Sequence, residues 1–137
     1  MFAFRSCFSG QVCEALLKGR RCEEIRVVDN MVMSPTYTRD AAGMIRDILL
    51  KELPSGIYHV TNSGSCSWFD FAKGIFEMQD VDANLLPIKT SAPGSKAKRP
   101  VFWALMSARI AEYGPGMPVW DNGLGFIMRE EAAQGSV

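Results

Sequence analysis

The hydrophobic positions of the chain follow a helical period and a strand period in turn. Helical spacing predicts a first helix over residues 9–18, and the β-branched run 25–28 predicts a strand that ends at a turn. A second helix is predicted to begin at Thr38, whose hydroxyl we expect to be the N-cap, with Asp40 in its first turn. The apolar stripe of this helix requires a core to face, and it consists of Ala41, Met44, Ile45, Ile48 and Leu49.

The same alternation continues in the second half of the chain. After a break at 54–56, residues 57–60 predict a strand. Ser67 and Asp70 have the spacing of a capping box that opens a helix. Residues 85–88 predict a short edge strand, because Pro87 cannot donate to a ladder hydrogen bond. Ser107 is a candidate cap for a short helix that ends before Gly114. Alternating helices and strands are typical of α/β architecture.

Length and composition indicate a soluble globular protein of about one domain. The chain has 137 residues, of which 47% are hydrophobic and 22% are charged. A formal net charge of zero disfavours binding to nucleic acid or to an anionic membrane. No apolar run reaches the ~20 residues of a membrane-spanning helix, and residues 1–5 are too short for a secretory signal. We therefore expect a cytoplasmic protein with no nucleic-acid partner and no membrane partner.

The cysteines and the single histidine do not have the spacing of a metal site. Cys7, Cys13, Cys22 and Cys66 form no C-x-x-C pair, and the only histidine is His59. Disulfide frameworks are typical of smaller secreted chains, which favours reduced thiols here. We therefore predict no metal-binding residues, and we assign His59 a structural role.

Several segments, in the same order, resemble one protein family. RVVDNMVMSPTYTRDAA, residues 26–42, resembles the RVVDDQxGSPTYTxDLA run of the dTDP-4-dehydrorhamnose reductases, which belong to the extended short-chain dehydrogenase/reductase superfamily. GIYHVTNSGSCSWFDFAKGIFE, residues 56–77, resembles their GIYHLTxSGxxSWYEFAxxIFE block. Residues 97–100, AKRP, resemble the AxRPxxS element, and residues 118–124 resemble the terminal LPxWxxxL helix. The resemblance extends from the first helix to Met128.

This resemblance corresponds to the C-terminal half of such a reductase. It implies an α/β fold that is an incomplete Rossmann-like reductase, in which residues 1–129 form the substrate-binding portion. Residues 130–137 are expected to form a flexible tail. In the family an N-terminal half holds NADPH and the C-terminal half closes over a dTDP-sugar. The reaction that the resemblance implies is hydride transfer to the C4 ketone of dTDP-4-dehydro-6-deoxy-L-mannose, which gives dTDP-L-rhamnose.

That chemistry needs residues that this sequence does not contain. It requires a Gly-rich turn for the pyrophosphate and a Tyr with a Lys four residues later. Tyr37, Tyr58 and Tyr113 are followed four places later by Ala, Asn and Met, and no glycine cluster follows a predicted strand in the required pattern. We therefore expect no catalytic and no cofactor-binding residues in this chain. Reduction would need the other half, which would supply the NADPH site.

Five residues are candidates for binding the substrate. Arg99, beside Lys98 in a basic loop, is either a bidentate partner of the diphosphate, as the family's Arg-Pro implies, or a solvated surface charge. Thr36 and Tyr37 either line the same cleft or, in the case of Tyr37, pack with the hydroxyl at the rim. Trp68 either stacks on a base or sugar or belongs to the core.

The chain departs from the family pattern at two places. The Gln and Gly before SPTYT are Met31 and Met33 here, and the Asn-Ser after Arg-Pro is replaced within Val-Phe-Trp-Ala, residues 101–104. These changes put apolar side chains at polar positions and are expected to enlarge the exposed apolar surface. They motivate an alternative function, a non-enzymatic protein-interaction or regulatory module derived from the same superfamily. Uncovered strand edges and the stripe of the second helix further predict self-association.

Overall fold

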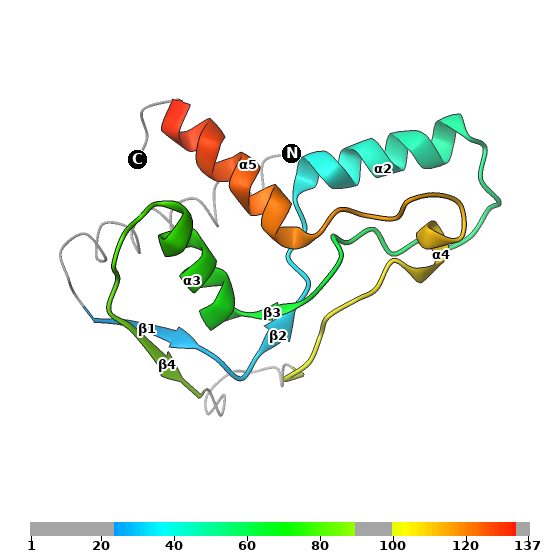
Figure 1. Ribbon diagram of the computed structural model, residues 1–137. Helices are drawn as coiled ribbons and strands as arrows, with labels where there is room; N and C mark the ends of the chain where they lie inside the picture. The colour runs from blue at the N-terminus through cyan, green and yellow to red at the C-terminus, as the bar shows by residue number, and fades with distance from the viewer. Residues whose placement is uncertain (1–23, 90–99, 134–137) are drawn as a thin grey trace.

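The computed structural model describes the chain over residues 24–89 and 100–133. The predicted first helix, residues 9–18, lies outside this part. The elements follow one another as β1 (Ile25–Val28), β2 (Val32–Met33), α2 (Thr38–Leu50), β3 (Cys66–Ser67), α3 (Trp68–Met78), β4 (Leu85–Ile88), α4 (Ala108–Ala111) and α5 (Trp120–Ala133) (Figure 1). Helices and strands alternate over much of this order, and the α/β class predicted from the sequence is confirmed.

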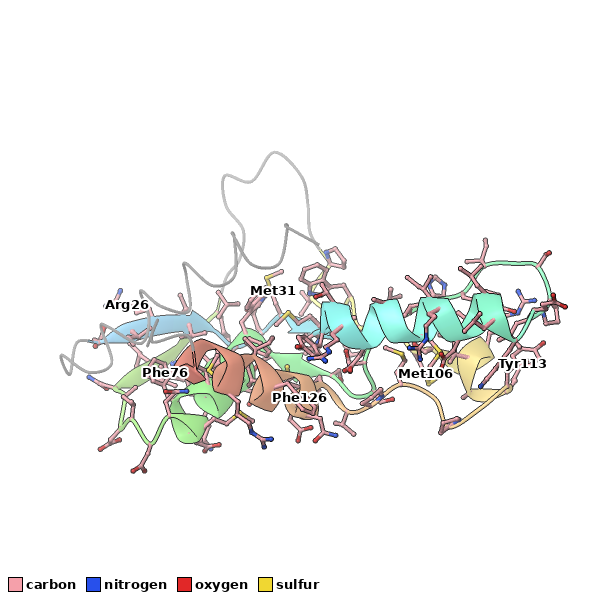
Figure 2. All side chains as sticks on the ribbon, turned by 90° about the horizontal axis from the view of Figure 1, so that it is seen from above. Arg26, Met31, Phe76, Met106, Tyr113 and Phe126 are labelled. Carbon is pink, nitrogen blue, oxygen red and sulfur yellow. The ribbon has the colours of Figure 1, made fainter. Side chains whose placement is uncertain are left out.

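The strands predicted at residues 25–28 and 85–88 form a small parallel sheet. β1 pairs with β4, with Ile25 opposite Leu85 and Val28 opposite Ile88. Both strands have the bounds that the sequence pattern predicts. Helix α3 contacts both strands on one side and α5 on the other. This part of the molecule lies at one end, and α2 and α4 lie at the other (Figures 1 and 2).

The short strand β2 has a neighbour on each edge. It pairs antiparallel with β3, with Val32 opposite Ser67. On its other edge Val32 forms a parallel bridge to Phe102. The N–H of Val32 donates to the carbonyl of Val101 at 2.9 Å, and the N–H of Trp103 donates to the carbonyl of Val32 at 3.0 Å. Residues 101–103 are therefore the outer strand of this group.

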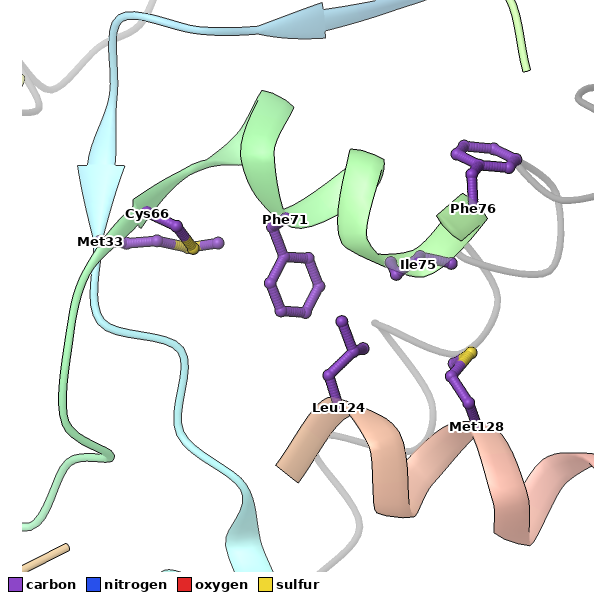
Figure 3. Packing of buried hydrophobic residues seen from close by; sticks show 7 residues of the cluster. All are labelled: Met33, Cys66, Phe71, Ile75, Phe76, Leu124 and Met128. Atoms are coloured by element: carbon purple, nitrogen blue, oxygen red, sulfur yellow. The ribbon is translucent and has the colours of Figure 1, made fainter. Parts of the chain in front are cut away.

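The core lies between α3, α5 and the β2–β3 pair (Figure 3). Phe71 and Ile75 of α3 point toward Leu124 and Met128 of α5, and the ring of Phe71 lies 5.6 Å from that of Trp120. The buried cluster comprises Met33, Cys66, Phe71, Ile75, Phe76, Leu124 and Met128. Met33 therefore contributes to the core, and the expectation that it would enlarge the exposed apolar surface is wrong.

Helix α3 begins with the predicted capping box. The Ser67 hydroxyl accepts a hydrogen bond from the N–H of Asp70 at 3.0 Å, and the Asp70 carboxylate accepts one from the N–H of Ser67 at 3.1 Å. Each residue thus satisfies an N–H that the first turn leaves without a helical partner.

The other two predicted caps are wrong, although both helices lie where they were expected. α2 begins at Thr38 itself, and Tyr37 occupies the N-cap position with no side-chain cap hydrogen bond. Asp40 lies in the first turn, as predicted. Ser107 precedes α4 without capping it. Its hydroxyl instead accepts from the N–H of Thr61 and donates to the carbonyl of the same residue, both at 3.0 Å.

The predicted strand at 57–60 does not form, and the stripe of α2 is not buried. Residues 57–60 have no strand partner within the described ranges, and the side chain of Ile57 is 80% exposed. Ile45 and Leu49 of α2 are 50% and 71% exposed, and no residue of α2 is buried. The stripe therefore faces no core built from described residues. A strand needs a ladder partner and an amphipathic helix needs a surface to cover it.

Helix α5 continues to Ala133, beyond Glu130, where the tail was expected to begin. Residues 134–137 lie outside the described part. The division of the chain at residue 129 stays a prediction.

We predict that Ser67→Ala lowers the free energy of unfolding by about 1 kcal/mol, because the first turn of α3 loses its capping acceptor. Ser65→Ala is the matched control, since Ser65 lies two residues earlier and is exposed. Urea unfolding followed by circular dichroism measures both. Equal losses for the two variants would show that the capping box does not stabilise α3 in the folded chain.

Candidate functional site

The segment from Ser34 to Thr38, here called the 34–38 junction, connects β2 to α2 and contains two of the candidate residues. Pro35 favours an extended backbone at Ser34. The hydroxyl of Ser34 accepts from the N–H of Leu105 at 3.1 Å and donates to the carbonyl of Leu105 at 3.0 Å. The hydroxyl of Thr36 lies 3.4 Å from the carbonyl of Ser34. The junction is thus fixed on one side to the segment that follows Arg-Pro.

Asn62 fixes the other side of the junction. Its side chain is fully buried, with 0% exposure. The amide oxygen accepts from the N–H of Tyr37 at 2.8 Å. The amide nitrogen donates to the Asp40 carboxylate at 2.7 Å and to the carbonyl of Pro118 at 3.1 Å. Both amide hydrogens are used, so one side chain joins the junction, the first turn of α2 and the segment that leads into α5.

The residue after Asn62 strengthens this connection. The N–H of Ser63 donates to the carbonyl of Pro118 at 2.8 Å, and its hydroxyl donates to the carbonyl of Met117 at 2.7 Å. The N–H of Trp120 in turn donates to the carbonyl of Ser63 at 3.1 Å. The start of α5 is therefore held at a fixed position relative to the 34–38 junction.

Tyr37 packs against α5. Its ring is nearly parallel to that of Phe126, with an interplanar angle of 8° and 6.4 Å between ring centroids. Gly123 permits this approach, because a Cβ atom at that position would lie 2.6 Å from the Cβ of Tyr37. The packing role considered for Tyr37 is therefore present in the structure, while contact with a ligand stays a prediction.

Trp68, the other candidate within the described residues, lies away from the 34–38 junction. Val32 lies opposite Ser67 in the antiparallel pair, so Trp68 lies toward the start of β2. Thr36 and Tyr37 follow the opposite end of β2. Trp68 also packs against the buried cluster, as expected for a core residue. Of the described candidates, only Thr36 and Tyr37 are brought together.

The two basic candidates, Arg99 and Lys98, lie outside the described residues. The described chain resumes at Pro100, and the carbonyl of Val101 accepts from the N–H of Val32. Because the bridge between Phe102 and Val32 is parallel, Pro100 lies toward the start of β2. The end of the basic loop therefore meets the fold on the same side as Trp68.

The described cysteine and histidine show no catalytic or metal-binding arrangement. Burial, and next the nearby Asp70 carboxylate, raise the pKa of the Cys66 thiol to about 12, so this thiol is protonated and a poor nucleophile at neutral pH. His59 is exposed. Within residues 24–89 and 100–133, no three His, Cys, Asp or Glu side chains are grouped as metal ligands would be. Over the same residues, no helix has the length and apolar character needed to cross a membrane.

Sequence reasoning missed Asn62 and Ser34 as the residues that fix the junction. Asn62 lies just after the predicted strand at 57–60, and its carboxylate partner Asp40 is 22 residues away. Ser34 and its partner Leu105 are 71 residues apart. Local periodicity contains no information about contacts of this separation, so only the folded arrangement identifies them.

We predict that Asn62→Ala lowers the free energy of unfolding by about 2–3 kcal/mol, because it leaves the half-buried N–H of Tyr37 and the carboxylate of Asp40 without this partner. Asn84→Ala is the matched control, since the side chain of Asn84 is exposed. Urea unfolding followed by tryptophan fluorescence compares the two variants. A loss no larger than that of the control would contradict the role assigned to Asn62.

We also predict opposite effects for two glycines of α5. Gly123→Ala should destabilise the fold by about 1–3 kcal/mol, because the new methyl group would collide with Tyr37. Gly125→Ala should instead stabilise it by up to about 1 kcal/mol, because alanine favours the helix and no atom lies within 4 Å of the added Cβ. Thermal unfolding measures both shifts. Shifts of the same sign would show that Tyr37 does not pack closely on α5.

The comparisons with known proteins agree on one family. Residues 9–132 match the family model described as the RmlD substrate binding domain. The chain is 38% identical over 111 residues to the spore coat polysaccharide biosynthesis protein SpsK of Bacillus subtilis. This match covers 81% of this chain and 38% of that protein. It is 36% identical over 91 residues to the dTDP-4-dehydrorhamnose reductase of Mycolicibacterium smegmatis, covering 66% of this chain and 28% of that protein.

A solved structure shares the fold. The crystal structure of dTDP-4-dehydrorhamnose reductase from Bacillus anthracis in complex with NADP matches with a TM-score of 0.76 and 38% sequence identity. The match covers 87% of this chain and 42% of that chain. The chain thus spans less than half the length of these relatives. The family predicted from the sequence resemblance is confirmed, and this chain belongs to the RmlD substrate-binding domain family.

Proposed function

We propose that this chain is the substrate-binding portion of an NADPH-dependent dTDP-4-dehydrorhamnose reductase-like protein of dTDP-L-rhamnose or other nucleotide-sugar biosynthesis. The observation that carries the proposal is the family match over residues 9–132. It is supported by the likeness to a reductase solved with NADP. A cytoplasmic location, expected from the sequence, forms part of the proposal.

In this proposal the chain binds the dTDP-sugar and another part of the protein holds NADPH. The sequence contains neither the Gly-rich turn nor the Tyr and Lys pair that the reduction requires, so we propose that it is not catalytically competent alone. Arg99 and Lys98 contact the diphosphate, while Thr36, Tyr37 and Trp68 contact the nucleoside or sugar. Trp68 lies toward the start of β2, whereas Thr36 and Tyr37 follow its end. Two separate groups of contacts of this kind would suit an elongated ligand such as a dTDP-sugar.

The exposed apolar stripe of α2 supports the proposal that another part of the protein covers this helix. Ile45 and Leu49 of α2, together with Ile57, are large apolar side chains that no described element covers. The run 57–60 has the composition of a strand but no partner among the described residues. We propose that a dinucleotide-binding half covers α2 and pairs with residues 57–60. The free energy gained on burying this apolar surface would hold the two parts together.

One observation favours the alternative, a non-enzymatic interaction module. Val101, Phe102 and Trp103 are exposed apolar residues in the segment where the family pattern has Asn-Ser. Exposed apolar groups of this size are typical of protein-interaction surfaces. The two functions differ in whether the chain binds a thymidine diphosphate.

We predict that dTDP quenches tryptophan fluorescence of the chain saturably and that Arg99→Ala weakens this binding about 10–100-fold, because a charge-assisted contact to the diphosphate is lost. Lys89→Ala is the control, since Lys89 is an exposed cation before the same loop. It should leave the affinity unchanged. No saturable response at millimolar dTDP would contradict the substrate-binding proposal and favour the interaction module.

A further inference from the structure

Tyr37 is held by two separate sets of contacts. Its N–H donates to the amide oxygen of Asn62 at 2.8 Å. Its ring lies nearly parallel to the ring of Phe126 on α5, and its Cβ approaches the helix where Gly123 leaves room for it. The backbone of this candidate ligand contact is therefore fixed by Asn62, and its side chain is fixed by α5.

Asn62 is placed to influence ligand binding without touching a ligand. Its side chain has 0% exposure, so it offers no surface that a ligand could reach. Its amide oxygen accepts from Tyr37, and its amide nitrogen donates to Asp40 and to the carbonyl of Pro118. Any effect of Asn62 on binding must therefore pass through the residues that it holds.

The same amide also fixes the surface on which Tyr37 packs. Pro118 lies two residues before the start of α5, and Figure 1 shows this start beside the start of α2. Tyr37 and its packing surface on α5 thus keep one relative position while Asn62 is present. A group that contacts a ligand has to be held within about 0.5 Å of its productive position by packing and by hydrogen bonds from the residues behind it. Asn62 provides such a hydrogen bond.

We infer that Asn62 is a positioning residue for nucleotide-sugar binding, which holds Tyr37 against α5 so that the tyrosine ring meets the nucleoside or the sugar. The inference rests on the proposed function, because it requires Tyr37 to contact the ligand. A ring that is fixed in advance loses less conformational entropy on binding than a mobile ring does. Removal of the Asn62 amide therefore weakens binding even in molecules that remain folded.

Calorimetric titration of the 137-residue chain with dTDP-L-rhamnose tests the inference. This probe carries both the nucleoside and the sugar, so it reports either contact of Tyr37. We expect Asn62→Ala to weaken binding about tenfold, because an aromatic contact with a base contributes about this much affinity. The titration is made at a temperature where circular dichroism shows the variant to be folded. Asn62→Ser, which keeps a polar group in the buried space, is a second variant if the first does not fold.

Phe76→Leu is the matched control for a general loss of stability. Phe76 is buried in the core near the end of α3, whereas β2 and β3 lie at the start of that helix. The substitution should lower the melting temperature, because it removes buried apolar contacts, and should leave the affinity for dTDP-L-rhamnose unchanged. An equal loss of affinity in Phe76→Leu and Asn62→Ala would overturn the inference.

A double-mutant cycle shows whether Asn62 acts through Tyr37. In a Tyr37→Ala chain the ring that Asn62 positions is absent, so Asn62→Ala should weaken binding much less than it does in the unsubstituted chain. An undiminished loss would overturn the inference. Unchanged affinity in a folded Asn62→Ala chain would also overturn it and leave the proposed function intact, whereas no binding by the unsubstituted chain would overturn both.

Discussion

The arrangement of the candidate site depends on one buried amide. Asn62 can satisfy its two donors and its acceptor only when Tyr37, Asp40 and Pro118 are all in position. Each buried polar group left unpaired costs about 1–3 kcal/mol, against a total stability of roughly 5–15 kcal/mol for a typical domain. The junction before α2 and the segment before α5 are therefore not independent loops. They are positioned together by this polar contact, which adds to the packing of Tyr37 on α5.

The apolar contribution is concentrated at the other end of the molecule. Phe71 and Ile75 pack against Leu124 and Met128 between two helices. Helix α2 differs, because its first turn is held by Asn62 while no described element covers the stripe beyond it. Within the described residues, one end of the fold thus has a packed core, and the other end is fixed by hydrogen bonds while its apolar stripe stays exposed. This asymmetry agrees with the proposal that the chain is the substrate-binding portion of a larger protein.

The sequence predicted elements whose stabilising contacts are local. The capping box joins Ser67 and Asp70, which are three positions apart, and it forms as predicted. Thr38 failed as a cap because Asn62, far away in the chain, holds Tyr37 at the N-cap position instead. The run 57–60 failed because strand formation depends on a partner that periodicity cannot supply. Candidate binding residues were found through family motifs, whereas the residues that position them required the three-dimensional structure.

Two departures from the family pattern, Met33 and Phe102, show that hydrophobicity alone does not determine whether a side chain is buried or exposed. Met33 stands where the family pattern has glycine, and Phe102 lies in the segment where it has Asn-Ser, so both positions carry large apolar side chains here. Met33 belongs to the buried cluster, so its side chain adds to the core (Figure 3). Phe102 lies beside β2, where no described element covers it and its side chain is exposed. The position relative to β2 therefore decides whether the same kind of change adds to the core or leaves an exposed apolar side chain.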